Sequence, residues 1–314
     1  MHPAYSVILF TTASGAGYGL LALLGLVGLS HGPVSDPWFG AVSLLMALGL
    51  ITAGLFSSML HLGHPERAWR AVTQWRSSWL SREGVAALLT YVPALAFGGL
   101  WLLPDSHRGA VGAAGLLTAL SSAVTIYCTG MIYASLSTIR QWAHPLVVPS
   151  YFAFSLATGA VLLLALAHAF GRGQPVQSVI AAAALALALG VKWLYWRSID
   201  SDPGRFTIEQ ATGLGRFGRV RQWESAHTTQ NFVMKEMGYR VARRHALRLR
   251  RLALAALALS SAAAISTMWL AAFAALLASC LAVALAAVGT LVERWLFFAE
   301  AEHVSMLYYG ASRA

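Results

Sequence analysis

The sequence predicts an all-α integral membrane protein, an eight-transmembrane-helix bundle that forms a single membrane domain over residues 1–314. The composition is 58% hydrophobic and 11% charged, and the mean hydropathy of +0.63 indicates that lipid surrounds most of the chain. A helix needs about 20 apolar residues, at about 1.5 Å per residue, to cross the hydrocarbon core. Such stretches recur at about 5–30, 38–61, 84–103, 109–139, 146–170, 176–197, 252–274 and 277–299.

Local signals mark several helix ends. Pro65 disfavours helix in the residue before it and ends the second span, and Ser81 is expected to cap the third. Only the sixth and seventh spans are separated by a long polar stretch, the basic loop 198–251. This loop is rich in Gly, Asp, Pro and Arg up to Gly218, which predicts turns. From about 232 to 251 it is expected to be helical and to continue into the seventh span.

The positive charges lie almost entirely on one face of this bundle. Eight crossings place both termini on the same face, and 20 of the 22 Lys and Arg residues fall on it, against Arg108 and Arg172 on the other. The positive-inside rule then predicts that both termini and the basic loop lie in the cytoplasm. The alternative is that the loop is basic only to hold a partner, and then it carries no information on orientation.

Several classes of protein are disfavoured by composition. The first residues lack the basic region of a cleavable signal peptide, so none is expected. Two isolated cysteines, Cys128 and Cys280, cannot hold an iron–sulfur cluster, a four-ligand zinc site or a c-type haem. Of ten histidines, only His61 and His168 fall within apolar spans, at ends predicted to lie on opposite faces. No haem or metal is therefore expected in this chain. Because the basic residues flank membrane helices, anionic lipid or an acidic protein is a better partner than nucleic acid.

The most chemically varied segment lies between the second and third spans, at 58–83. An ionisable group at the edge of the hydrocarbon is a functional candidate by default, since burying a charge costs about 2.5–3.5 kcal/mol. A quinone head group needs hydrogen-bond donors for its carbonyls, apolar walls for its ring and a titratable group to relay protons. Helix caps and interfacial aromatic residues are the structural alternative for each residue taken singly. The ionisable residues of this segment are His61, His64, Glu66, Arg67, Arg70, Arg76, Arg82 and Glu83.

At this segment the chain resembles a known family. Ser-Met-Leu-His-Leu-Gly followed by Pro-x-Arg-Ala at 58–68, with Leu-Ser-x-Glu at 80–83, looks like the membrane anchor subunit of dimethyl-sulfoxide-reductase-type molybdoenzymes. Further stretches are similar to one branch, the anchor of the membrane-bound, cytoplasm-facing sulfite dehydrogenase. They are His-Pro-Ala-Tyr-Ser-Val at 2–7, Ser-Gly-Ala-Gly-Tyr-Gly at 14–19, Met-Ile-Tyr-Ala-Ser-Leu at 131–136, Thr-Ile-Arg-Gln-Trp at 138–142 and Lys-Glu-Met-Gly-Tyr-Arg-Val-Ala-Arg at 235–243.

The resemblance implies a specific architecture. The family anchor contains no metal and binds a quinone, here ubiquinone or menaquinone, between its helices. It holds an iron–sulfur electron-transfer subunit, which carries a catalytic subunit with molybdenum in a bis-pterin cofactor. In the family, a His at the position of His61 and a Glu at the position of Glu83 are tied to quinol binding. A cytoplasmic basic face fits catalytic subunits that remain in the cytoplasm.

Roles can be assigned to the candidate quinone-binding residues. Glu83 is expected to be the proton relay or a hydrogen-bond partner, and His61 a donor to a quinone oxygen. A role for His64 is inferred from its place in the same segment. Arg82 or Arg67 is expected to stabilise negative charge on the partly reduced ring. The predicted pocket wall comprises Tyr127, Tyr133 and Arg140.

The basic loop admits two interpretations. A collar of arginines beside a membrane helix binds anionic lipid without any partner. We favour docking of the iron–sulfur subunit, because a lipid collar does not need the polar and aromatic stretch 223–232 that precedes it. Glu236 and Arg240 form a favourable i,i+4 pair in the predicted helix. The residues expected to dock the partner are Arg70, Arg76, Arg240, Arg243 and Arg244.

The preferred function is passage of electrons from a sulfite-oxidising molybdenum partner to quinone. The main alternative is the reverse flow, in the quinol-oxidising anchor of a dimethyl sulfoxide or other oxyanion reductase. A secondary transporter is disfavoured because no internal repeat is found and the acidic residues lie towards helix ends. A pure scaffold gives no reason for His61 and Glu83 at the membrane boundary.

Reversing the charge at Arg243 and Arg244, as Arg243→Glu and Arg244→Glu, is expected to release the hydrophilic subunits from membranes, because it replaces attraction with repulsion at the docking surface. The measurement is the distribution of those subunits between membrane and soluble fractions. Unchanged membrane retention would exclude docking at these two arginines.

Overall fold

The computed structural model describes residues 3–31, 36–60, 62–103, 107–202, 206–224, 229, 231–237 and 241–311. Most of the described backbone is helical and none of it forms a strand; an isolated antiparallel bridge joins Ile139 and His303. The long helices are α1 (Tyr5–His31), α2 (Pro37–Met59), α3 (Trp79–Leu102), α4 (Arg108–Ala134), α5 (Val147–Ala169), α6 (Pro175–Ser201), α9 (Val241–Ser266) and α10 (Ala272–Ala299). The short helices are η1 (Pro65–Val72), α7 (Ile208–Thr212), η2 (Gly215–Phe217), α8 (Phe232–Met237), η3 (Thr267–Trp269) and η4 (Val304–Leu307).

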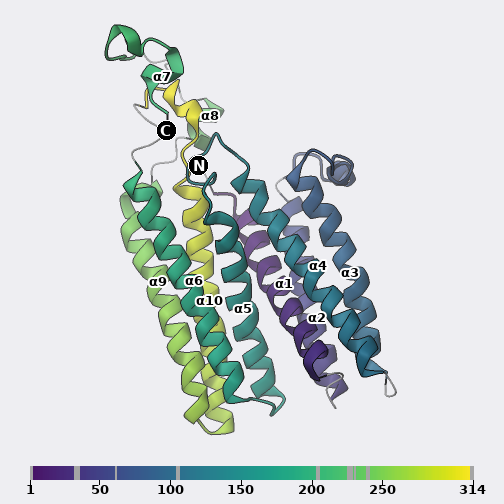
Figure 1. Ribbon diagram of the computed structural model, residues 1–314. Coiled ribbons are helices and arrows are strands. Elements are labelled where there is room, and N and C mark those ends of the chain that lie inside the picture. Colours follow the sequence, from purple (N-terminus) through teal and green to yellow (C-terminus); the bar gives the residue numbers. More distant parts are fainter. Residues whose placement is uncertain are drawn as a thin grey trace.

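Eight helices of the described chain are long and apolar enough to cross a membrane, which confirms the predicted fold class. Each span contains 23 to 28 residues, enough for a bilayer core of about 30 Å. The helices run side by side in a single bundle, and both ends of the chain lie at the end of the bundle that carries α7 and α8 (Figure 1). We call this end the loop end; the segment 62–78, which contains η1, also lies there.

The eight spans form two groups that meet along α1 and α5. The first group contains α1 to α4, and the second contains α5, α6, α9 and α10 (Figure 1). Helix α1 packs against α2 and α4 in its own group and also along α5, while α10 packs against α5 and α9. The seam between α1 and α5 is therefore the main contact between the two groups.

Glycines allow α1 to approach its neighbours very closely. A Cβ atom on Gly19 would lie 1.8 Å from the backbone oxygen of Ser155, and one on Gly159 would lie 2.3 Å from the backbone of Gly19. A Cβ on Gly25 would lie 2.3 Å from the backbone oxygen of Gly115 in α4. In a membrane, where helices associate through packing rather than through the hydrophobic effect, small residues at crossings provide this close contact.

The N-terminus of α3 differs from the prediction. The helix begins at Trp79 rather than near 84, and its N-cap is Ser78, whose side chain accepts from the Ser81 amide at 3.5 Å. Ser81 lies inside the first turn, where its hydroxyl donates to the backbone oxygen of Ala71. The prediction of Ser81 as the cap was wrong because a second serine three residues earlier fills the capping position. Glu83 consequently lies in the second turn of α3, deeper than expected.

The basic loop contains more regular structure than predicted. Thr207 caps α7 through a reciprocal pair of hydrogen bonds with Gln210, at 3.3 and 3.2 Å. Helices α8 and α9 lie on either side of residues 238–240. These three residues, which include Arg240, lie outside the described ranges. The predicted Glu236–Arg240 pair and the side chains of Arg243 and Arg244 also lie outside the described part of the chain.

Gly19→Ala is expected to lower the thermal stability of the purified protein, because the added methyl group must push α1 away from α5. Overpacking of this kind costs about 1–3 kcal/mol. Gly49→Ala is the matched control, since nothing lies within 4 Å of a Cβ there and alanine favours helix. The melting temperature in detergent measures both. Equal melting temperatures for the two variants would contradict close packing at Gly19.

Candidate functional site

Glu83 is a carboxyl group enclosed by protein near the loop end of the bundle. Its residue is 4% exposed, and it sits in the second turn of α3 facing α4. The hydroxyl of Thr129 in α4 donates a hydrogen bond to its Oε1. The structure thus agrees with the prediction of Glu83 as an ionisable group at the membrane boundary, and it adds Thr129 as its partner.

The contact between Thr129 and Glu83 suits both protonation states of the carboxyl group. The Thr129 hydroxyl also lies 3.0 Å from the backbone oxygen of Thr125, and a hydroxyl has only one hydrogen to donate. When Thr129 donates to Glu83, the carboxyl group is an acceptor and needs no proton. When Thr129 turns to the Thr125 carbonyl, a protonated Glu83 can donate to the Thr129 oxygen instead. Glu83 can therefore gain or lose a proton without leaving its partner unsatisfied.

Trp79, Arg82 and Tyr127 form a mixed aromatic and cationic surface next to Glu83. The Arg82 guanidinium lies 4.2 Å from the centre of the Trp79 ring, and Tyr127 meets the same ring edge-on at 5.7 Å. Arg82 also donates to the backbone oxygens of Trp75 and Arg76, at 2.9 and 2.7 Å. The side chain that precedes Glu83 in sequence is thus turned to the surface and holds the 62–78 segment.

The remaining predicted quinone-binding residues of this segment are exposed or lie outside the described ranges. His64 and Glu66 form a contact of 2.9 Å with both side chains more than 60% exposed, and Arg67 lies 3.8 Å from the same Glu66 oxygen. His61 lies outside the described residues. No contact joins His64 or Arg67 to Glu83 in the described part of the chain, so their roles stay predictions.

Tyr133 and Arg140 make no hydrogen bond or ring contact with Glu83 or Trp79 among the described residues, although Tyr133 lies within electrostatic range of Glu83. Tyr133 is buried where α4, α5 and α10 meet, stacked on Tyr151 at 5.7 Å and edge-on to Phe297 at 5.4 Å. Arg140 donates to the backbone oxygens of Ile199 and Asp202, at 3.0 and 2.7 Å. The structure therefore places Tyr133 in the aromatic core and Arg140 at the end of α6.

Two of the predicted docking residues are exposed at the loop end. Arg70 lies 5.6 Å from the centre of the Trp69 ring, and Arg76 lies 5.5 Å from that of Trp75. All four side chains face solvent, the tryptophans at 64% and 53% exposure. Exposed tryptophan and arginine are the residues that most often anchor protein interfaces.

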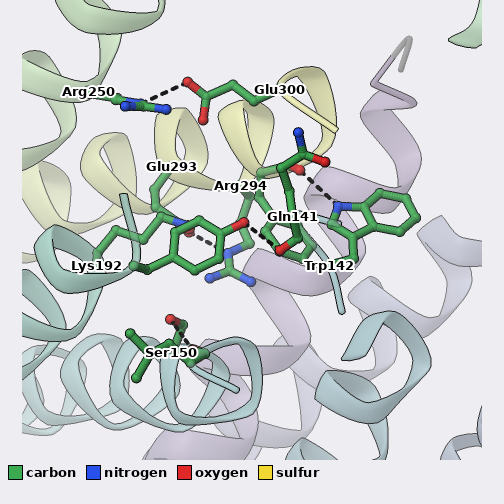
Figure 2. A network of polar contacts seen from close by, with 11 residues as sticks. Gln141, Trp142, Ser150, Lys192, Arg250, Glu293, Arg294 and Glu300 are labelled. Atoms are coloured by element: carbon green, nitrogen blue, oxygen red, sulfur yellow. Dashed lines mark hydrogen bonds and ion pairs between the residues drawn. The ribbon is translucent and has the colours of Figure 1, made fainter. Parts of the chain in front are cut away.

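A second group of buried charges lies between α6 and α10. Oε1 of Glu293 forms an ion pair with Lys192 at 2.6 Å, and Oε2 accepts a hydrogen bond from Nε of Arg294 at 2.5 Å. The three side chains are at most 2% exposed, and Figure 2 shows them inside the bundle. We call Lys192, Glu293 and Arg294 the triad. Two cations and one carboxylate give it a net charge of +1 when all three are ionised.

Aromatic rings and hydrogen bonds surround the triad. The ammonium of Lys192 lies 4.0 Å from the centre of the Tyr195 ring, and the Tyr195 hydroxyl donates to the Gln141 backbone oxygen at 2.8 Å. The Trp142 indole donates to the backbone oxygen of Phe297 at 3.0 Å (Figure 2). These contacts fix the 138–144 segment against α6 and α10. Arg250 donates to Glu300 at 2.8 Å, a contact that Figure 2 also draws.

The sequence as a whole matches a known family. A family model described as the DMSO reductase anchor subunit (DmsC) matches residues 1–300. The chain belongs to the DmsC family. It is also 33% identical, over 327 aligned positions, to a sulfite dehydrogenase subunit of Allochromatium vinosum, and the alignment covers 98% of this chain and 99% of that protein. Both the predicted family and its sulfite dehydrogenase branch are thus confirmed. This DmsC-family chain is a multi-pass anchor subunit of an oxidoreductase with catalytic and electron-transfer subunits.

Sequence reasoning missed the triad of this DmsC-family chain. The charge count treats Lys192 and Arg294 as loop charges, although both lie within long helices and are buried. Removing them from the count leaves the charge asymmetry in place. A usable signal was present, because all three residues fall within the apolar stretches 176–197 and 277–299, where ionisable residues are rare and need partners.

Glu293→Ala is expected to destabilise the protein by about 3–5 kcal/mol, because it leaves Lys192 and Arg294 buried without a counter-charge. The measurement is the thermal unfolding of the detergent-solubilised chain. Glu224→Ala, which removes an exposed carboxylate in the basic loop, is the control. If the two variants unfold at the same temperature, Glu293 does not neutralise buried cations.

Proposed function

We propose that this chain is the quinone-binding, non-catalytic anchor of a molybdenum and iron–sulfur oxidoreductase, and that it passes electrons from an iron–sulfur partner to quinone during sulfite oxidation. The observation that carries the proposal is Glu83, an enclosed carboxyl group at the loop end with a partner, Thr129, that suits both of its protonation states. The identity to a sulfite dehydrogenase subunit supports the sulfite branch.

The quinone is a substrate in this proposal, and the residues around Glu83 suit its head group. Quinone supplies the two-electron, two-proton redox chemistry. Glu83 delivers a proton towards a ring oxygen and regains one afterwards, and the Arg82 guanidinium provides positive charge close to the membrane boundary. The cavity inside the bundle next to Thr129 leaves only about 10 Å³ for the centre of a water-sized sphere, so it accommodates a water molecule rather than a ring. The ring is therefore assigned to the outer side, where Trp79 and Tyr127 provide an aromatic wall.

The loop end is the proposed docking surface for the iron–sulfur subunit. Arg70 and Arg76, with Trp69 and Trp75 beneath them, present charge and aromatic area from the segment that directly precedes Glu83. An electron carrier bound there lies close to the proposed quinone site, because both belong to the same end of α3. In this proposal the loop end faces the cytoplasm of a bacterial cell, as the charge asymmetry predicts.

The second candidate is the reverse reaction, in which the anchor oxidises quinol for a sulfoxide or oxyanion reductase. The description of the matching family as a DMSO reductase anchor favours it. The same residues serve in both directions, since Glu83 accepts a proton from quinol as readily as it gives one to quinone.

Sulfite-dependent reduction of a short-chain quinone in membranes tests the proposal, with the chain present, deleted, or carrying Glu83→Gln. We expect the activity to disappear on deletion and to fall by about 100-fold or more in Glu83→Gln, because loss of a positioned proton-transfer group costs about 10²–10⁴ in rate. Assembly of the complex should be unchanged in Glu83→Gln, since glutamine preserves shape and hydrogen bonding to Thr129.

Glu224→Gln, an exposed carboxylate of the basic loop, is the matched control and should retain full activity. Equal activity with and without the chain would exclude it as the electron path. Full activity in Glu83→Gln would exclude the proton role alone. Membranes that show no sulfite-dependent quinone reduction but oxidise quinol when a sulfoxide is supplied would favour the second candidate.

A further inference from the structure

The buried charges of the described chain balance only when Glu83 is included. The Asp, Glu, Lys and Arg residues that are fully buried in the described part of the chain are Glu83, Lys192, Glu293 and Arg294. Two are cations and two are carboxylates. Glu293 is paired with both cations, whereas Glu83 makes no ion pair. The ionised form of Glu83 is thus the charge that neutralises the net +1 of the triad.

Polar groups without partners lie between Glu83 and the triad. The hydroxyls of Tyr18, Tyr151 and Thr290 and the Nη1 and Nη2 atoms of Arg294 are buried and have no hydrogen-bond partner of good geometry among the described residues. The Arg294 guanidinium lies 4.3 Å from the centre of the Tyr151 ring, a cation–π contact that leaves its terminal nitrogens available. Buried polar groups of this kind are normally satisfied, by water where protein cannot reach.

Two small cavities bring these groups together. The first is lined by Tyr18 of α1, Thr129 of α4 and Tyr151 of α5, and the second by Tyr151, Thr290 and Arg294. Each leaves about 10 Å³ for the centre of a water-sized sphere, roughly the room for one water molecule. Both cavities are lined by Thr11, Gly15, Tyr151 and Ser155, so they are neighbours.

We propose that Arg294 is the counter-ion of Glu83, and that its guanidinium acts on Glu83 through two water molecules on either side of the Tyr151 hydroxyl. The connection runs from Glu83 to Thr129, through the first water to Tyr151, and through the second water to Arg294. Glu293 holds the guanidinium in place through its Nε, and Lys192 pairs with the other oxygen of Glu293. Arg294 is therefore a positioning residue for proton exchange at Glu83, an inference that rests on the proposed function.

The other groups around Glu83 do not supply this charge. Arg82 is held at the surface by the backbone oxygens of Trp75 and Arg76, so its charge lies outside the bundle, where solvent and salt screen it. Tyr18 of α1 and Cys128 and Tyr133 of α4 lie within electrostatic range of Glu83, and these side-chain types are neutral near physiological pH. Ionisation of Glu83 is thus supported from within the bundle by Arg294.

The experiment follows the protonation of Glu83 directly in the purified complex. The infrared carbonyl band of a protonated carboxyl group is recorded across a pH series, and the Glu83→Gln variant identifies the contribution of Glu83. In the Arg294→Met variant we expect Glu83 to bind its proton about tenfold more tightly than in the parent, which raises the pH midpoint of its titration by about one unit. Arg294→Lys should restore most of the parent titration, because it restores the charge.

Two conservative variants keep the test valid if Arg294→Met does not fold. Tyr151→Phe removes the hydroxyl shared by both cavities but keeps the ring that stacks on Tyr133, and it should shift the Glu83 titration in the same direction. Tyr195→Phe is the matched control, since it removes a buried hydroxyl beside Lys192 that lines neither cavity. It should titrate like the parent.

Turnover provides the second readout. In Tyr151→Phe, kcat for quinone reduction should fall several-fold with KM unchanged, because proton exchange slows while quinone binding does not. A parent-like titration in both Arg294→Met and Tyr151→Phe would overturn the proposal, and so would an equal shift in Tyr195→Phe. The infrared titration does not depend on quinone turnover. It therefore distinguishes a failure of this inference from a failure of the proposed quinone function.

Discussion

The close crossing of α1 and α5 is the constraint on which the rest of this structure depends. Gly19 and Gly159 remove the side chains that would separate the two helices, and the backbones meet at van der Waals distance. Thr11, Gly15 and Gly19 are spaced four apart on α1, and Tyr151, Ser155 and Gly159 have the same spacing on α5. Residues four apart share a helix face, so one seam contains both the glycine contact and the hydroxyl groups that line the cavities. The two groups of helices, one with Glu83 and the other with the triad, are joined along it.

Charge in the bundle interior is tolerated because it is balanced. An isolated buried cation is costly in a low-dielectric interior, and even a paired one repays its desolvation only with good geometry. The triad meets this requirement with two short contacts to one carboxylate and with the rings of Tyr195, Trp196 and Phe297 around Lys192, at 4.0, 5.1 and 5.4 Å. Hydrophobic residues would pack equally well there. The total charge of this group changes when Glu83 takes up a proton. That change gives the buried charges a functional explanation that hydrophobic residues in their place would lack.

The fold could be predicted from hydropathy because each span is a local property of the sequence. Every predicted span overlaps a helix of the structure, but several ends differ by about five residues, at the start of α3, the end of α4 and the start of α10. Of these three ends, only the start of α3 is set by a side-chain cap, Ser78. Glu83 could be found because it directly follows a recognisable loop motif. Its partner Thr129 lies 46 residues away, and an apolar helix gives no sequence sign of which hydroxyl faces which neighbour.

The triad is the clearest example of information that is not local. Lys192 and Glu293 are separated by about one hundred residues and meet only because α5, α6 and α10 pack together. Near the ends of their apolar stretches, Lys192 and Arg294 resemble ordinary flanking charges. Tyr133 and Arg140 illustrate the same limit, since their place near the loop end was correct while the neighbours that they contact depend on the helix crossing angles.

Under the proposed function, the arrangement at Glu83 also explains how one anchor family can serve reactions that run in opposite directions. The family model is described as the DMSO reductase anchor subunit, whereas a relative that aligns with nearly the whole chain is a sulfite dehydrogenase subunit. A reductase takes electrons from the membrane and a dehydrogenase delivers them to it. The hydroxyl of Thr129 has one hydrogen and two acceptors within reach, so it adapts to Glu83 before and after proton transfer without a change in the backbone. A carboxyl group whose partner can hydrogen-bond to both protonation states does not by itself set a direction. The direction then follows from the reduction potentials of the partner subunits and the quinone pool, and the anchor can be retained while its catalytic partner changes.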